Sequence, residues 1–257
     1  MTLTKEQIDV IEKTIENSLR KKFKSYKPET KFMPFHYRLL GKDRMALYSF
    51  IHSLNTHFGT AIYEPVAETL ADLNYNKAKM QFPMGNNISE KAQIEIQNII
   101  NELSMGNDPK KLEEINRIRK VCIKGKINKL RTVKADLLLE SSDGTIHLFD
   151  LKTTKPNKGN FKDFKRTLLE WIAIYLYKNP EALVHSYIAL PYNPYEPKPY
   201  ERWTMKGMID INNELRVGDE FWDFLGGKGA YSELLDCFER VGIRMVPEID
   251  DYFSHFK

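Results

Sequence analysis

The spacing of apolar residues predicts several helices along the chain. Thr4 and Gln7 form the pattern of a capping box, which marks the start of a helix. Apolar residues then recur near the helical period at Ile8, Ile11, Ile15, Leu19 and Phe23. The same kind of reading predicts further helices over residues 44–58, 61–73, 90–103, 109–120, about 161–177, 214–225 and 231–241.

Strand-like apolar runs lie in the middle of the chain. Residues 133–154, VKADLLLESSDGTIHLFDLKTT, contain two such runs separated by a Ser-Asp-Gly turn, and residues 184–190 predict a third central strand. Residues 33–37 and 83–89 are expected to form a turn and a loop. Helices mixed with central strands predict the α/β class.

The hairpin brings charged residues together at its open end. A three-residue loop of Ser142, Asp143 and Gly144 would place Asp136 opposite Asp150, with Cβ atoms about 4.5–5.5 Å apart. Lys152 would share the face of Asp150, because alternate residues of a strand point to the same side. A loop one residue shorter or longer would put the two acids on opposite faces.

Length and composition indicate a globular protein. The chain has 257 residues, of which 42% are hydrophobic, so it can build a real core. We expect a single domain, 1–257, with a helical part at about 1–120, a catalytic hairpin and helix at about 121–190, and a Pro/Tyr-rich loop with C-terminal helices at about 191–257. No long apolar run or signal peptide is evident, so a cytoplasmic protein is expected. Cys122 and Cys237 are expected to be reduced core thiols.

Charge is unevenly distributed. Residues 1–190 carry 31 basic and 22 acidic side chains, whereas residues 191–257 carry 8 basic and 13 acidic ones. Between Ile115 and Ala135 there are eight basic residues and no acid. Such a run is usually a solvated face, but it leads into the acidic hairpin and is therefore a candidate for phosphate contacts.

The acids of the hairpin suggest a divalent metal site. Mg²⁺ prefers carboxylate oxygens, so Asp136 and Asp150, with the Leu151 carbonyl nearby, are candidate ligands. Lys152 could orient or deprotonate a water molecule. Glu64 is a candidate additional ligand, on a helix whose other acid, Glu68, is a weaker candidate. The alternative is that Asp136 and Asp150 only cap strand ends while Lys152 is an exposed edge charge.

Candidate DNA contacts lie on both sides of the hairpin. The helix after Asn160 carries cations in its first turns, where they oppose the helix dipole, and a bound polyanion would relieve this. The candidates for phosphate contact are Lys129, Arg131, Lys155, Asn157, Lys162, Lys165 and Arg166. The proline- and tyrosine-rich stretch 191–203 is expected to be a stiff surface loop that packs on the protein, contacts DNA or joins a second subunit.

The residues just described resemble a known nuclease pattern. Asp136, thirteen intervening residues and then Asp150-Leu151-Lys152 resemble the PD-(D/E)XK motif, with Ala135 where proline is often found. Glu64 resembles the additional acid that many such nucleases carry on a preceding helix. The segments 35–67, 150–171 and 191–227 look like the TdeIII-type family of type II restriction endonucleases.

This resemblance implies a function and a fold. It implies a restriction-endonuclease-like core with a central mixed sheet flanked by helices. It also implies Mg²⁺-dependent cleavage of double-stranded DNA at a short palindromic site of the GGNCC kind, a homodimer, and a DNA methyltransferase in the same system. The alternatives are a repair or structure-selective nuclease, a DNA-binding module with a degenerate metal site, and a purely structural α/β protein.

Overall fold

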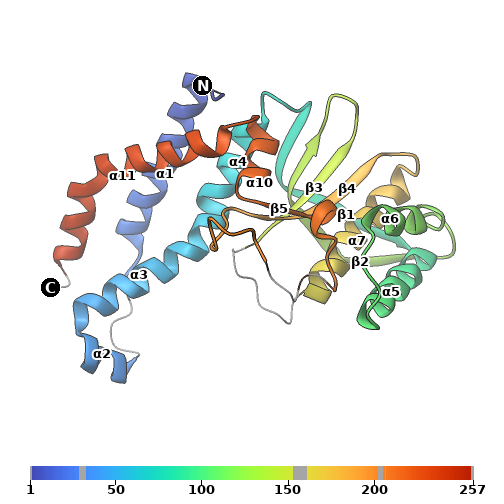
Figure 1. Ribbon diagram of the computed structural model, residues 1–257, viewed down its shortest axis with the longest axis horizontal. Coiled ribbons are helices and arrows are strands. Elements are labelled where there is room, and N and C mark those ends of the chain that lie inside the picture. Colours follow the sequence, from blue (N-terminus) through green and yellow to red (C-terminus); the bar gives the residue numbers. More distant parts are fainter. Residues whose placement is uncertain (1, 29–32, 153–160, 202–204, 206, 256–257) are drawn as a thin grey trace.

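In the part of the chain that the structure describes, the centre of the protein is a five-stranded mixed sheet with the strand order β1-β2-β3-β4-β5 (Figure 1). The computed structural model describes residues 2–28, 33–152, 161–201, 205 and 207–255. Neighbouring strands are antiparallel from β1 to β3 and parallel from β3 to β5. The strands are β1 (Lys77–Ser89), β2 (Ile127–Glu140), β3 (Ile146–Leu151), β4 (Val184–Leu190) and β5 (Leu215–Val217). The expected α/β fold with a mixed sheet is therefore confirmed.

Helices cover both faces of this sheet (Figure 1). The described helices are α1 (Lys5–Ser25), α2 (Pro34–Leu40), α3 (Lys42–Phe58), the π-helix η1 (Gly59–Tyr63), α4 (Glu64–Ala71), α5 (Glu90–Ser104), α6 (Lys111–Arg119), α7 (Phe161–Lys178), α9 (Ile211–Glu214), α10 (Asp219–Gly226) and α11 (Ala230–Ser254). Of these, α2 and α3 project away from the sheet (Figure 1). None of the described helices is long and apolar enough to cross a membrane.

Alternation along the strands divides the apolar residues between two cores. Leu138 and Leu148 point to one face, where they pack with residues of α5, α6 and α7. Leu137 and Phe149 point to the other face, where they pack with residues of α1, α4, α10 and α11. The sheet is thus buried on both sides, which is why its central strands are nearly continuous apolar runs.

Two helices from distant parts of the sequence form one outer layer. α1 and α11 lie side by side (Figure 1) and are joined by ion pairs. Arg240 and Arg244 of α11 each approach Glu12 of α1 to 2.6 Å. The capping box of Thr4 and Gln7 at the start of α1 is present as predicted.

Several sequence-based boundaries were wrong. Residues 83–89, expected as a loop, belong to β1, and residues 33–37, expected as a turn, lie mostly in α2. The helix predicted over 214–225 is instead α9, β5 and α10, because Leu215–Val217 pairs with β4. Cys122 and Cys237 are buried free thiols, as expected.

Candidate active site

The hairpin of β2 and β3 has the register on which the acidic pair depends. Leu137 pairs with Phe149 and Glu140 with Ile146, so the next pair outward is Asp136 with Asp150. The loop is closed by a 2.9 Å hydrogen bond from the Ser141 N–H to the Thr145 carbonyl. Gly144 has a φ of +81°, the left-handed conformation that glycine adopts without strain. The predicted three-residue loop is confirmed, and with it the facing positions of the two acids.

Asp136 links three parts of the site. Its Oδ2 accepts a 2.9 Å hydrogen bond from the main-chain N–H of Leu151. Its Oδ1 lies 3.4 Å from the side-chain amide nitrogen of Gln81 on β1. The carboxylate is therefore held between the end of β3 and the neighbouring strand.

Asp150 is the most buried acid of the hairpin, with 5% of its surface exposed. Its Oδ1 lies 2.5 Å from Lys152 Nζ. Burial raises the pKa of Asp150 to about 6, the Lys152 ammonium opposes this rise, and the Asp136 carboxylate adds to it. The Asp150 carboxyl therefore binds a proton more tightly than an ordinary aspartate, and desolvation contributes more to this than repulsion between the acids.

Lys152 follows β3 on the same side as Asp150. Its N–H donates to the Ala189 carbonyl of β4 at 2.9 Å, which fixes its main chain at the end of the parallel pair. Its ammonium lies 5.2 Å from the centre of the Phe164 ring on α7. The side chain is 29% exposed, so it can reach a solvent-filled space while remaining paired with Asp150.

Glu64 approaches the acidic pair from a different element. It is the first residue of α4 and is buried, and this burial raises the pKa of its carboxyl group. Its Oε2 accepts a 3.0 Å hydrogen bond from the Gln81 amide. Glu68 is only partly buried and lines a separate hollow with Gln7 and Lys79, so only one of the two helix acids joins the site.

Gln81 belongs to the site, although nothing in the sequence pattern marks it as a candidate. An amide has no charge pattern that marks it as functional, and its position depends on pairing between β1 and β2. Met80 pairs with Leu137 and Phe82 with Ala135, which places Gln81 opposite Asp136. Only a correct alignment of these two strands would have drawn attention to it.

These side chains open into a cavity of about 700 Å³. Glu64, Gln81, Asp136 and Lys152 lie in its wall. The opposite wall comes from α3, η1, Phe221 of α10 and the loop after β4, whose lining residues are Pro191, Tyr192 and Pro194. Part of the Pro/Tyr-rich loop therefore faces the site.

The donor set suits a magnesium ion that keeps much of its water. Asp136 and Asp150 face each other, and Glu64 joins them through Gln81. Among the described residues, no three acid, histidine or cysteine side chains converge as a ready-made metal centre. Mg²⁺ commonly uses only one or two carboxylates and retains several waters, so this set fits it.

The basic residues differ in what they can contact. Lys129, Arg131 and Lys162 are exposed. Arg166 is partly buried and donates a 2.8 Å hydrogen bond to the Gln97 side chain. Lys155 and Asn157 lie outside the described residues.

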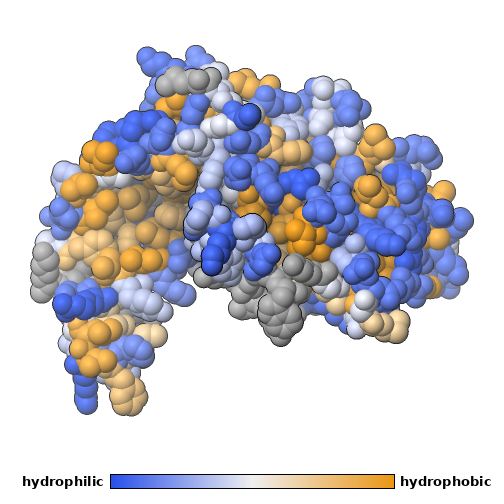
Figure 2. All heavy atoms as spheres, viewed as in Figure 1, coloured by the Kyte–Doolittle hydropathy of each residue, from blue (hydrophilic) through white to orange (hydrophobic). Residues whose placement is uncertain are grey.

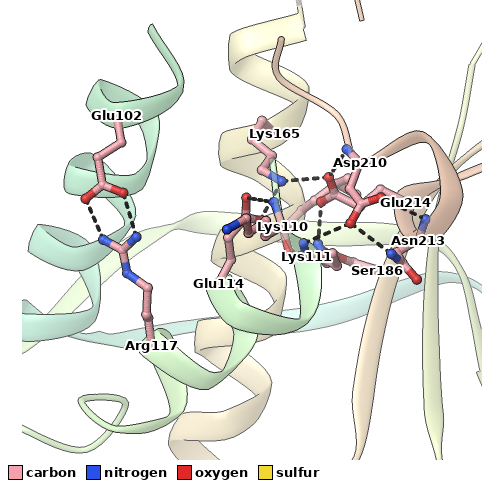
Figure 3. A network of polar contacts seen from close by, with 11 residues as sticks. Glu102, Lys110, Lys111, Glu114, Arg117, Lys165, Ser186, Asp210, Asn213 and Glu214 are labelled. Atoms are coloured by element: carbon pink, nitrogen blue, oxygen red, sulfur yellow. Dashed lines mark hydrogen bonds and ion pairs between the residues drawn. The ribbon is translucent and has the colours of Figure 1, made fainter. Parts of the chain in front are cut away.

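Lys165 is not available to DNA, and its selection as a phosphate contact was wrong. It is fully buried and lies 2.5 Å from Glu114 and 2.6 Å from Glu214 (Figure 3). Lys111 lies 2.7 Å from the other oxygen of Glu214. Acids from within the protein, not an external polyanion, therefore compensate this cation near the start of α7.

An acidic pair beside a lysine, with Asp136 and Lys152 in the wall of a cavity, is an arrangement suited to hydrolysis. The chain matches the family model described as "Type II restriction endonuclease, HinfI" over residues 3–242. The chain belongs to this family of type II restriction endonucleases.

Individual proteins with similar sequences are also named type II restriction enzymes. The type II restriction enzyme HgiCII of Herpetosiphon aurantiacus is 28% identical over 221 residues, which cover 84% of this chain and 80% of the relative. HgiEI of the same organism is 28% identical over 222 residues, covering 84% and 79%. The type II restriction enzyme MjaII of Methanocaldococcus jannaschii is 26% identical over 226 residues, covering 82% of this chain and 59% of the relative.

Proposed function

We propose that this protein is a Mg²⁺-dependent type II restriction endonuclease that cuts both strands of DNA at a short palindromic site. The observation that carries this proposal is the facing pair of Asp136 and Asp150 with Lys152 beside them. The family membership and the names of the relatives support the reaction class. The motif supports assignment to the PD-(D/E)XK superfamily, and the residues matching the TdeIII-type family favour a GGNCC-like site.

We assign the metal to the open end of the hairpin. Asp136, Asp150, the Leu151 carbonyl and Glu64 would hold Mg²⁺, which when bound polarises a phosphodiester and lowers the pKa of its water. In its neutral amine form, Lys152 is placed to take a proton from the attacking water, and the ammonium so formed would offset charge that develops on the phosphoryl oxygens. The cavity beside these groups has room for the scissile phosphate.

We place the duplex along the exposed basic residues next to the site. Lys129 and Arg131 lie on β2 a few residues before Asp136, and Lys162 lies at the start of α7. Ammonium and guanidinium groups at these positions would displace counterions from the phosphate backbone. Lys155 and Asn157 remain candidates for the same role.

A homodimer is the proposed active species. Cleavage of both strands at a palindrome calls for two sites related by two-fold symmetry, and each chain supplies one hairpin site. The surface formed by α2 and α3 exposes large apolar side chains, including Phe35 at 85% and Leu39 at 82% exposure. Figure 2 shows hydrophobic residues gathered over this projecting part of the molecule. The same α3 helix lines the cavity, so a partner bound here would lie next to the site.

Sedimentation of a Leu39→Glu variant tests this interface. A charge within this surface should shift the protein towards the monomer and convert double-strand cutting into slow nicking. A variant of Ile94, which is 49% exposed on α5 away from this surface, is the matched control. Unchanged sedimentation of Leu39→Glu would place the contact between subunits elsewhere.

The function itself is tested with plasmid DNA and either Mg²⁺ or Ca²⁺. Discrete fragments with Mg²⁺ alone are expected, and DNA modified by the methyltransferase of the same system should resist cutting. A smear of products would indicate a nonspecific or structure-selective nuclease. DNA binding without any cutting would indicate a noncatalytic DNA-binding module.

A further inference from the structure

Gln81 has an unusual main-chain conformation for a residue within a strand. Its φ is +49°, and among the described residues it is the only one other than glycine with a positive φ. A residue with a Cβ atom adopts this left-handed region at an energetic cost. The pairing of β1 with β2 continues on both sides, through Met80 with Leu137 and Phe82 with Ala135. The strain is thus confined to the residue opposite Asp136.

This conformation brings an amide to two acids from different elements. Gln81 Nε2 lies 3.0 Å from Glu64 on α4 and 3.4 Å from Asp136 on β2. The side chain is exposed and lies in the wall of the 700 Å³ cavity. It is therefore not fixed by packing in a core, and its polar contacts are with the two acids.

The chemistry of an amide suits this position. A lysine or arginine here would neutralise the acids and compete with a cation for their oxygens. The uncharged NH₂ group donates hydrogen bonds and leaves the negative charge of both carboxylates in place. Local strain that persists at such a site is a recurring property of functional positions.

We propose that Gln81 is a positioning residue that orients the carboxylates of Glu64 and Asp136 towards one divalent cation. This inference rests on the proposed function and adds a residue to its site. The strained main chain at Gln81 directs the amide between the two acids. Without the amide, Glu64 loses the hydrogen bond from Gln81 and Asp136 is held on the other side by the Leu151 N–H, so the cation loses a preorganised pair of oxygens.

Gln81→Gly separates this role from a structural one. Glycine accepts a positive φ, so the variant relieves strain and removes the amide together. Its melting temperature should stay the same or rise by about 2 °C. Its affinity for Mn²⁺, measured without DNA from the electron paramagnetic resonance signal of the free ion, should fall about tenfold. The Mg²⁺ concentration for half-maximal cleavage should rise by a similar factor, with much of the rate regained at high Mg²⁺.

Lys79→Gly is the matched control on the same strand. Lys79 is exposed, pairs regularly with Leu138 and lies outside the cavity. Glycine there should lower the melting temperature and leave Mn²⁺ affinity unchanged. Gln81→Glu provides a second test, because it keeps the shape of the side chain but replaces the donor with a third acid. Its melting temperature should fall below that of Gln81→Gly, because strain remains and a like charge is added beside Glu64.

The outcomes distinguish the two proposals. If the wild type binds Mn²⁺ and cuts DNA while Gln81→Gly has unchanged Mn²⁺ affinity and Mg²⁺ dependence, the role of Gln81 is refuted and the proposed function stands. A large fall in the melting temperature of Gln81→Gly would refute the strained-residue argument. If the wild type neither binds Mn²⁺ nor cuts DNA, both proposals fail.

Discussion

The main-chain N–H of Leu151 donates a 2.9 Å hydrogen bond to the carboxylate of Asp136. Leu151 stands between Asp150 and Lys152, so an acid from β2 is bonded to the main chain between the other two charged residues. Leu137 and Phe149 form the last main-chain pair of β2 and β3 at this end, and the bond from Leu151 to the Asp136 side chain joins the two strands one position further. Asp136 is thereby both a proposed metal ligand and a link that fixes the end of β3.

Asp136→Asn and Asp136→Ala should separate these two roles. Asparagine can still accept from Leu151, so its melting temperature should change by only a degree or two. Alanine loses the bond, at a cost of about 1 kcal/mol. Both should lose cleavage by about 10²-fold or more, because a carboxylate ligand is gone. If Asp136→Asn cuts DNA at the wild-type rate, Asp136 is not a metal ligand.

Asp150 should make the metal-free protein less stable as pH rises. Its pKa in the folded protein is about 6, above the usual 3.8, so the folded state binds a proton more tightly than the unfolded state. The resulting stabilisation is complete below about pH 4 and is lost as pH rises through about 6. By linkage it amounts to about 2–3 kcal/mol.

Asp150→Asn is the matching variant, since it removes the charge but keeps the shape. In urea unfolding with a chelator, it should be more stable than the wild type at pH 7.5 and about equal at pH 4. If the wild type instead gains stability relative to Asp150→Asn between pH 4 and pH 7.5, the raised pKa of Asp150 is contradicted.

Lys152→Ala should abolish cutting while Ca²⁺-dependent DNA binding survives. Loss of proton transfer and charge stabilisation typically costs about 10²–10⁴-fold in rate. Lys152→Arg is the control, because guanidinium keeps the charge but has no neutral form in this pH range that could accept a proton from water. Binding is measured by fluorescence anisotropy and folding by circular dichroism. Loss of folding in Lys152→Ala would favour a structural role instead.

Lys129 and Arg131 should contribute to the salt dependence of DNA binding. Replacing both with alanine removes two proposed phosphate contacts, so the slope of log K against log salt should fall by about 2. Lys110 is an exposed lysine on the α6 side of the molecule and serves as a control. An unchanged slope in the double variant would show that the duplex does not pass over this part of β2.

Lys165→Met should affect stability rather than DNA binding. Removing one partner from a buried ion-pair network leaves the facing acids uncompensated, at a cost of about 3–5 kcal/mol. Glu114 and Glu214 both lose their contact with this ammonium. Chemical denaturation measures the loss, and the salt slope of binding should match the wild type in any folded fraction. A reduced slope with normal stability would restore Lys165 as a phosphate contact.

The local part of the site was predictable from sequence. Loop length and the parity of a strand determine which residues face each other, and Gly144 marks the turn, so the facing of Asp136 and Asp150 followed from a short segment. The start of the helix after Ser89 was also predictable from a local signal, because serine is a common N-cap residue and its hydroxyl accepts a hydrogen bond from the Ala92 N–H three residues later.

Features that depend on distant residues were not predictable. Lys165 looked like a misplaced cation because its acidic partners lie about fifty residues away on either side in the sequence. β1 contains Pro83 and Gly85, which usually indicate a loop, but they fall at irregularities of an edge strand where such residues are tolerated. β5 is only three residues long and is defined by its pairing with β4.

The pairing of α1 with α11 has a consequence for synthesis. Glu12 meets Arg240 and Arg244, so the charged side of the first helix gains these partners only after more than two hundred further residues have been made. Phe221, which lines the cavity, also belongs to this late segment. A ribosome-bound nascent chain therefore carries the acids and the lysine long before it can enclose them. The cavity therefore gains the Phe221 part of its wall only in the last part of synthesis, well after the residues of the proposed site have been made.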